Sequence, residues 1–179
     1  MKKLTLTLLT AAVLTTGSAF AGTEAKSFKK QVVEVEPTCY FRDTEFQVDV
    51  FYTGIIGSRG STLGTGSGGG VGLNFFFARY FGIGWEGSVY SNQGTASWMP
   101  VNGNFFFRYP ICSLNLAPYV MVGGGADFQQ NRDSIGYGNV GGGLEYRFTP
   151  NIGIFADGRY YYGGSGNVAN IRSGVKFAF

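Results

Sequence analysis

The chain closes with Asn170-Ile171-Arg172-Ser173-Gly174-Val175-Lys176-Phe177-Ala178-Phe179. Its alternate positions form two sets, one apolar and the other polar or small. The apolar set is Ile171, Val175, Phe177 and Phe179, and the opposite set is Asn170, Arg172, Gly174 and Lys176. Because successive side chains of a β-strand point to opposite faces, this stretch predicts a strand with one oily face and one polar face.

The same alternation recurs upstream in seven further runs that are separated by turn-rich clusters. In the first run, for example, Phe46, Val48 and Val50 alternate with Gln47 and Asp49. Together with the last run, the predicted strands are 45–56, 68–79, 82–92, 98–109, 116–129, 135–148, 152–162 and 167–179. This pattern predicts an all-β protein, an eight-stranded antiparallel up-and-down transmembrane β-barrel.

A soluble β-sandwich would also alternate, with its apolar faces forming a shared core. The polar faces of this chain, however, carry few charges and many glycines, and no predicted strand has the lysine and glutamate content of a soluble surface. The chain contains 30 Gly, 17 Phe, 11 Tyr and 2 Trp residues. Glycine and aromatic residues in such numbers favour strongly curved strands that face lipid.

The first residues have the order of a secretory signal peptide, which we expect to span 1–21. Lys2 and Lys3 precede an apolar run, and Ala19-Phe20-Ala21 provides small residues at the cleavage site. Residues 22–44 are charged and poor in glycine, so they predict a periplasmic N-terminal arm, with the barrel at 45–179. Without Lys2 and Lys3 the formal net charge falls from +3 to +1, so a nucleic-acid partner is not expected.

An even number of strands places both ends of the barrel on one side, which the signal peptide suggests is the periplasm. The predicted turns on that side are Tyr80-Phe81, Pro110 to Asn115 and Thr149 to Asn151. The predicted outward connections are short and lie at about 57–67, 93–97, 130–134 and 163–166.

The polar faces predict a charge network inside the barrel. Its acids are Asp49, Glu86, Asp127, Glu145 and Asp157, and its bases are Arg108, Arg147, Arg159, Arg172 and Lys176. Unpaired charges in a narrow barrel are costly to desolvate, so this near balance fits an interior filled by side chains. If Gly163 to Gly166 is the last turn, Asp157 lies directly opposite Arg172. Water filling an open lumen is the alternative.

The two cysteines fall on the same side of the predicted membrane. Cys39 precedes the first strand by six residues, and Cys112 lies in the turn after the fourth strand. Six extended residues reach about 20 Å, enough to cross the mouth of a small barrel. A disulfide that folds the arm under the barrel as a lid is therefore one hypothesis, and two unpaired or intermolecular thiols are the other.

Residues 45–179 resemble the small outer-membrane β-barrel proteins, the group that includes the OmpA membrane domain, OmpX and OmpW. The most specific element is the ending Val175-Lys176-Phe177-Ala178-Phe179. In that family an alternating last strand with a terminal aromatic residue is the signal for the barrel-assembly machinery, which implies this role for Val175, Phe177 and Phe179. The resemblance also implies a monomer in the lipid of the bacterial outer membrane.

The chain contains no histidine, so the usual general base of hydrolases and the commonest metal ligand are missing. We therefore expect no enzymatic activity, metal or cofactor. The expected function is a structural or envelope-integrity role, or surface interaction with an unidentified partner. The alternative is a narrow channel or carrier for small or hydrophobic solutes, with an apolar path formed by Phe51, Phe76, Phe106 and Phe155.

Overall fold

The computed structural model describes residues 39–57, 65–92, 95–129, 134–163 and 167–179. The predicted signal peptide (1–21) and residues 22–38 of the predicted arm lie outside these ranges. No helix in this part of the chain is long and apolar enough to cross a bilayer.

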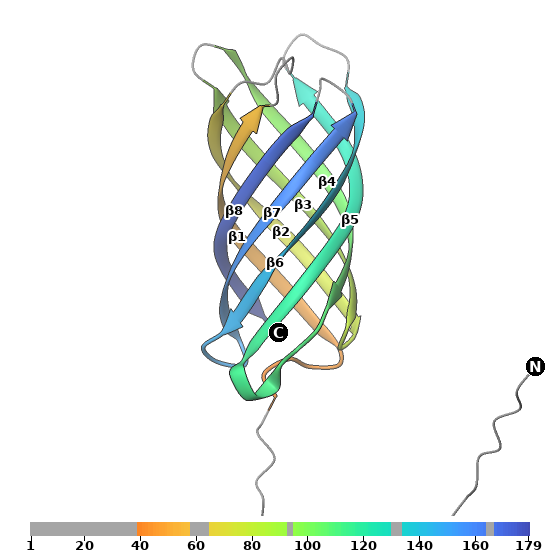
Figure 1. Cartoon of the computed structure of the whole chain (residues 1–179), viewed down its shortest axis with the longest axis vertical. Helices are drawn as coiled ribbons and strands as arrows, with labels where there is room; N and C mark the ends of the chain where they lie inside the picture. The colour runs from red at the N-terminus through yellow and green to blue at the C-terminus, as the bar shows by residue number, and fades with distance from the viewer. Residues whose placement is uncertain (1–38, 58–64, 93–94, 130–133, 164–166) are drawn as a thin grey trace, which may run out of the picture. The chain divides into compact units, whose positions relative to one another are not determined.

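Eight antiparallel strands form a closed barrel in which each strand pairs with its neighbours in the sequence (Figure 1). The strands are β1 (Glu45–Gly57), β2 (Gly66–Ala78), β3 (Phe81–Asn92), β4 (Thr95–Arg108), β5 (Leu116–Gln129), β6 (Ile135–Arg147), β7 (Ile152–Gly163) and β8 (Val168–Ala178), with one short 3-10 helix, η1 (Cys112–Leu114), before β5. The predicted all-β, up-and-down architecture is confirmed.

The barrel closes through β1 and β8. The register places Val50 opposite Val175, and the backbones of Phe46 and Phe179 exchange two hydrogen bonds of 3.2 and 2.8 Å. This closure brings residue 46 and the last residue to one end of the barrel. The turns at 79–80, 109–115 and 148–151 lie at the same end, which we call the short-turn end (Figure 1).

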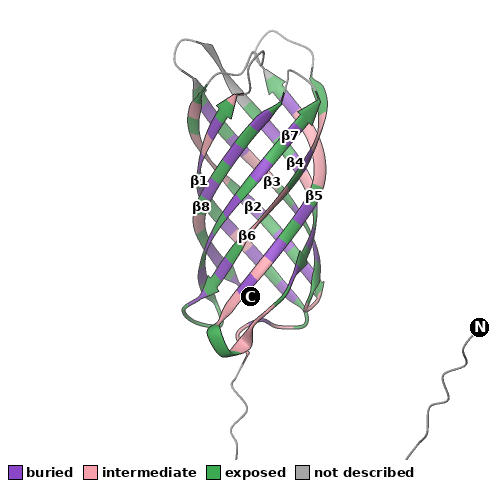
Figure 2. Ribbon diagram, viewed as in Figure 1, coloured by how far each residue is buried: buried purple, intermediate pink, exposed green. Residues whose placement is uncertain are grey.

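Burial alternates along the strands, except in glycine-rich stretches of β2, β5 and β6 that are half-buried, so the two predicted faces become the inside and the outside of the barrel (Figure 2). In β8, Arg172 and Lys176 are buried, whereas Val175 and Phe177 are exposed. Apolar side chains cover the outside of all eight strands, far more than a soluble surface carries. Lipid therefore surrounds this exterior, and the soluble sandwich is excluded because its core would have to bury these residues.

Two predicted connections differ from the structure. The stretch 93–97 was expected as a loop, but β3 continues to Asn92 and β4 already begins at Thr95, which pairs with Asn92. Small and polar residues give no apolar alternation there, although a backbone ladder can extend through them. The turn expected at Tyr80-Phe81 is also shifted, because Phe81 pairs with Phe107 as the first residue of β3.

Glycines make room for large side chains inside the barrel. Phe51 lies between Gly70 on β2 and Gly174 on β8. A Cβ atom would lie 2.6 Å from the Phe51 ring if built at Gly70, and 2.8 Å from the Phe51 Cβ if built at Gly174. The interior can therefore hold an aromatic ring at this level only because both neighbours lack a side chain.

Candidate functional site

The charged residues that the sequence predicts for the interior all point into the barrel. They are Asp49, Glu86, Arg108, Asp127, Glu145, Arg147, Asp157, Arg159, Arg172 and Lys176. All of them except Asp127 belong to three clusters of ion pairs, and we take this interior charge network as the candidate functional site.

The central cluster joins opposite walls of the barrel. The Arg172 guanidinium donates to both oxygens of Asp157, at 2.8 and 2.6 Å, and to Glu86 Oε2 at 2.7 Å. Arg159 on β7 binds both carboxylate oxygens of Glu86 on β3. Because β3 and β7 are four strands apart in an eight-stranded barrel, this ion pair crosses the lumen. Asp157 faces Arg172 across the ladder, in the register that the turn length predicts.

A second cluster lies near the short-turn end and contains a residue that the sequence analysis missed, Glu45. Its carboxylate accepts hydrogen bonds from Arg108 at 2.8 Å and from Arg147 at 2.6 Å. Arg147 also pairs with Glu145. Glu45 has the same strand parity as Gln47, so extending the alternation by one step would have placed it inside.

The third cluster surrounds Lys176. Its ammonium donates to Asp49 at 2.9 Å and to Gln47 at 3.2 Å, and Asn74 donates to the same Asp49 oxygen at 2.7 Å. Asp127 lies farther toward the other end of the barrel, where it accepts a hydrogen bond of 3.0 Å from the Ile135 backbone amide.

The four inward phenylalanines pack against these charges. Phe51 and Phe155 form an edge-to-face pair with centroids 6.4 Å apart, and the Arg172 guanidinium lies 4.4 Å from the Phe51 centroid. Phe76 and Phe106 form a second pair at 6.2 Å. The rings thus contact each other and the guanidinium groups, which stabilises the cations inside a low-dielectric space.

Residues 39–45 lie across the short-turn end, where a disulfide ties Cys39 to Cys112. The Phe41 ring is only 1% exposed and lies 5.3 Å from the Arg108 guanidinium and 5.0 Å from that of Arg147. The Arg42 carbonyl accepts a further hydrogen bond from Arg108. This segment therefore fits the hypothesised lid, with its bond to the turn before β5.

Replacing both Cys39 and Cys112 with serine should leave the barrel closed but accelerate trypsin cleavage after Arg42, because only noncovalent contacts then hold the lid. Mass spectrometry of digests of the detergent-solubilised protein, quenched and then reduced so that the disulfide no longer holds the cleaved fragment, measures this rate. Reduction of the native protein should reproduce the effect and should not accelerate cleavage of the double variant further. Equal cleavage rates for the native protein and the variant would contradict a latching role.

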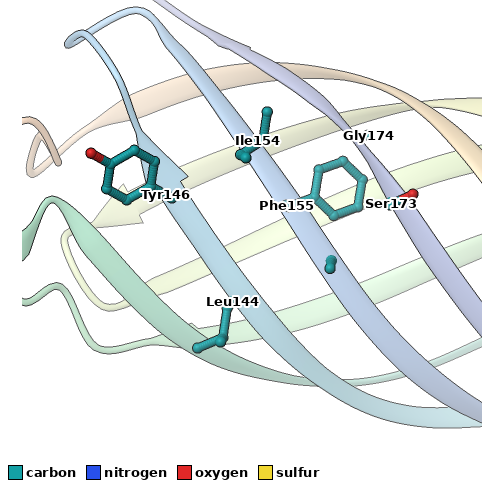
Figure 3. Close-up of a pocket in the computed structure, with 7 residues that line it drawn as sticks. Leu144, Tyr146, Ile154, Phe155, Ser173 and Gly174 are labelled. Atoms are coloured by element: carbon teal, nitrogen blue, oxygen red, sulfur yellow. The ribbon is translucent and has the colours of Figure 1, made fainter.

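The lipid-facing wall carries a shallow hollow of about 410 Å³ over β6, β7 and β8 (Figure 3). Leu144, Tyr146 and Ile154 line it with exposed side chains, and Phe155, whose buried ring points into the barrel, is also part of the lining. The hollow exists because three lining residues are small, namely Ala156, Ser173 and Gly174. It is an apolar surface open to lipid and offers no reactive groups.

The residues of the expected assembly signal lie on the outside of β8. Val175 and Phe177 are exposed to lipid, and Phe179 follows the end of the strand. Within the described residues, no group of three or more His, Cys, Asp or Glu side chains has the arrangement of a metal site.

Comparison with known proteins identifies the fold. The sequence matches no protein-family model and no curated protein. Neisserial surface protein A is a structural neighbour with a TM-score of 0.60 and 15% identity, over 77% of this chain and 98% of that one. The N-terminal β-barrel domain of Pseudomonas aeruginosa OprF has a TM-score of 0.55 and 18% identity, over 74% and 97%.

A third neighbour is Ail, the attachment invasion locus protein of Yersinia pestis, in complex with the heparin analogue sucrose octasulfate. Its TM-score is 0.52 at 15% identity, over 77% of this chain and 100% of that one. At these identities the likeness concerns the fold, and it agrees with the lipid-facing exterior. The chain therefore has the transmembrane β-barrel fold of the small bacterial outer-membrane proteins, as the resemblance implied.

Proposed function

We propose that this barrel has a structural or envelope-integrity role in the bacterial outer membrane and that its lumen is closed to ions. The observation that carries the proposal is the ion pair between Glu86 and Arg159, which joins opposite walls. Arg172 adds a second link from β8 to Glu86. An ion crossing the lumen would have to separate buried opposite charges, and breaking such a pair costs about 3–5 kcal/mol.

In this proposal, the contact with a surface partner is made at the end of the barrel opposite the short turns. The connections predicted there fall largely outside the described residues, but the strands that they join are paired in the closed barrel. Binding residues commonly occur on loops that a rigid scaffold holds. Two of the neighbours are a surface protein and an attachment protein by name. A contact with an unidentified surface partner is consistent with both facts.

The proposal describes a monomer in outer-membrane lipid. Every strand edge is paired within the closed barrel, so no edge is left to recruit a second copy. The ending Val175, Phe177 and Phe179 presents alternating apolar side chains to lipid, and we infer that the barrel-assembly machinery reads it. No catalytic step belongs to this function.

Conductance in planar lipid bilayers tests the closed state. The native protein should show no stable unitary openings, because the cross-lumen pairs and packed rings fill the pore. A double variant, Glu86→Ala with Arg172→Ala, should open measurably more often, since it removes both links to β3. Val120→Ala, on the lipid face, is the matched control and should stay silent. Stable openings of the native protein would instead support the narrow channel or carrier.

A further inference from the structure

Two asparagines on the inner wall have amide groups without hydrogen-bond partners. Asn104 on β4 and Asn139 on β6 are 5% and 0% exposed, respectively. Neither the Nδ2 nor the Oδ1 atom of either residue forms a hydrogen bond in the structure. Burying an amide without a partner costs several kcal/mol, and in folded proteins such groups are normally paired with protein or with ordered water.

Both asparagines flank the same glycine. The register places Gly123 on β5 opposite Asn104 on one side and opposite Asn139 on the other. Since neighbouring strands lie about 4.8 Å apart, the two asparagine backbones are separated by roughly 9–10 Å. Gly123 puts no side chain between them, and the Asn104 amide lies over this glycine, since a Cβ atom built at Gly123 would lie 2.4 Å from Asn104 Oδ1. We call the site between the two amides, above Gly123, the notch.

We propose that this notch binds ordered water, held between the side-chain amides of Asn104 and Asn139. A primary amide offers two donors and one acceptor oxygen, and water can complement both kinds of group. The two amides bring no charge to the notch, so neutral hydrogen-bonding molecules fit it better than ions. Each bound water would satisfy amide atoms that otherwise lack partners.

The notch continues a pattern along the inner wall. Across neighbouring strands the register reads Asn74, Gly84, Asn104, Gly123 and Asn139, an alternation of amide and glycine. Because barrel strands are tilted, such a row climbs the wall. It begins near the short-turn end of β2 and reaches the opposite half of β6.

Asp49 adds another buried polar atom beside Asn74, at the short-turn end of this row. Asn74 donates to Oδ2 of Asp49, while Oδ1 of Asp49 is buried without a hydrogen-bond partner. Gly84 has to lack a side chain here, since a Cβ atom would lie 2.1 Å from the Asn74 oxygen. The row therefore combines glycines that make room for asparagine side chains with buried polar atoms that lack a partner, and water is the ligand that complements those atoms.

Nuclear magnetic resonance of the full barrel in detergent micelles tests the proposal through water-to-amide cross-relaxation. The side-chain amide protons of both Asn104 and Asn139 should show cross-peaks to water. Asn102 provides a matched internal control, because its amide donates to Glu86 and its oxygen accepts from Tyr137, and its cross-peak should be absent or much weaker. Resolved amide signals of Asn104 and Asn139 without water cross-peaks would overturn the proposal.

A variant separates shared water from two independent hydration events. Asn139→Leu should abolish or strongly reduce the water cross-peak of Asn104, because the bridging water loses one of its two holders. Asn170→Leu on β8, outside the notch, should leave that cross-peak unchanged. If Asn139→Leu does not fold, Asn139→Ala removes the same holder and should likewise reduce the cross-peak. A direct Asn104 to Asn139 amide hydrogen bond in the native protein would refute the water site.

Discussion

Replacing Glu86 with glutamine is expected to lower the free energy of unfolding by about 3–5 kcal/mol, the usual cost of removing one partner of a buried ion pair. Glu86 accepts hydrogen bonds from both Arg159 and Arg172. A glutamine has the same shape but only one acceptor oxygen, and its amino group would face a guanidinium. The two arginines would then share Asp157 as their remaining nearby carboxylate among the described contacts.

Urea unfolding of the protein in lipid vesicles, followed by tryptophan fluorescence, measures this change. Asp43→Asn is the matched control, since it neutralises the acidic partner of the exposed ion pair between Arg79 and Asp43. An exposed pair contributes about 0–1 kcal/mol, so the control should unfold almost like the native protein. Equal effects of the two substitutions would mean that the interior pairs are hydrated and the lumen is open.

Replacing Val50 with arginine is expected to destabilise the barrel by about 2–4 kcal/mol, the cost of a basic residue on the lipid face near the bilayer midplane. Val50 lies in the middle of β1 with its side chain outside. A guanidinium there cannot reach the interior network, because the strand directs it into hydrocarbon. It must therefore bring water with it or bend toward the headgroups.

An arginine introduced at a turn should lower the free energy of unfolding only slightly. Leu114 lies in η1 at the short-turn end and is exposed, so Leu114→Arg places the charge beyond the hydrocarbon region, where the expected cost is about 0–1 kcal/mol. Unfolding in vesicles and the mobility shift between heated and unheated samples on a gel compare the two variants. A harmless Val50→Arg would contradict a lipid-facing exterior.

The faces of the strands could be predicted from the sequence because strand parity is a local property. Each residue two positions along a strand returns to the same side, so Lys176 and Arg172 could be placed inside without knowing their partners. The pairing of Asp157 with Arg172 was also accessible, since it depends only on the length of one turn.

The remaining contacts depend on how the barrel closes. The bond between Glu86 and Arg159 requires the heights of β3 and β7 around the whole barrel, and strand parity carries no information on height. The burial of Phe41 could not be predicted either, because the residue precedes the first strand and has no alternation to place it. Glu45 was missed at the strand boundary, where such patterns are least definite.

The junction of β1 with β8 also determines how this molecule can form. Gln47 pairs with Ala178, so the first strand meets its final neighbour only when the last residues of the chain are present. Until then both outer edges expose backbone groups that could join another chain and aggregate. Contacts between such distant parts of the chain make assembly slow, so a barrel that has not yet closed is exposed to aggregation through its unpaired edges.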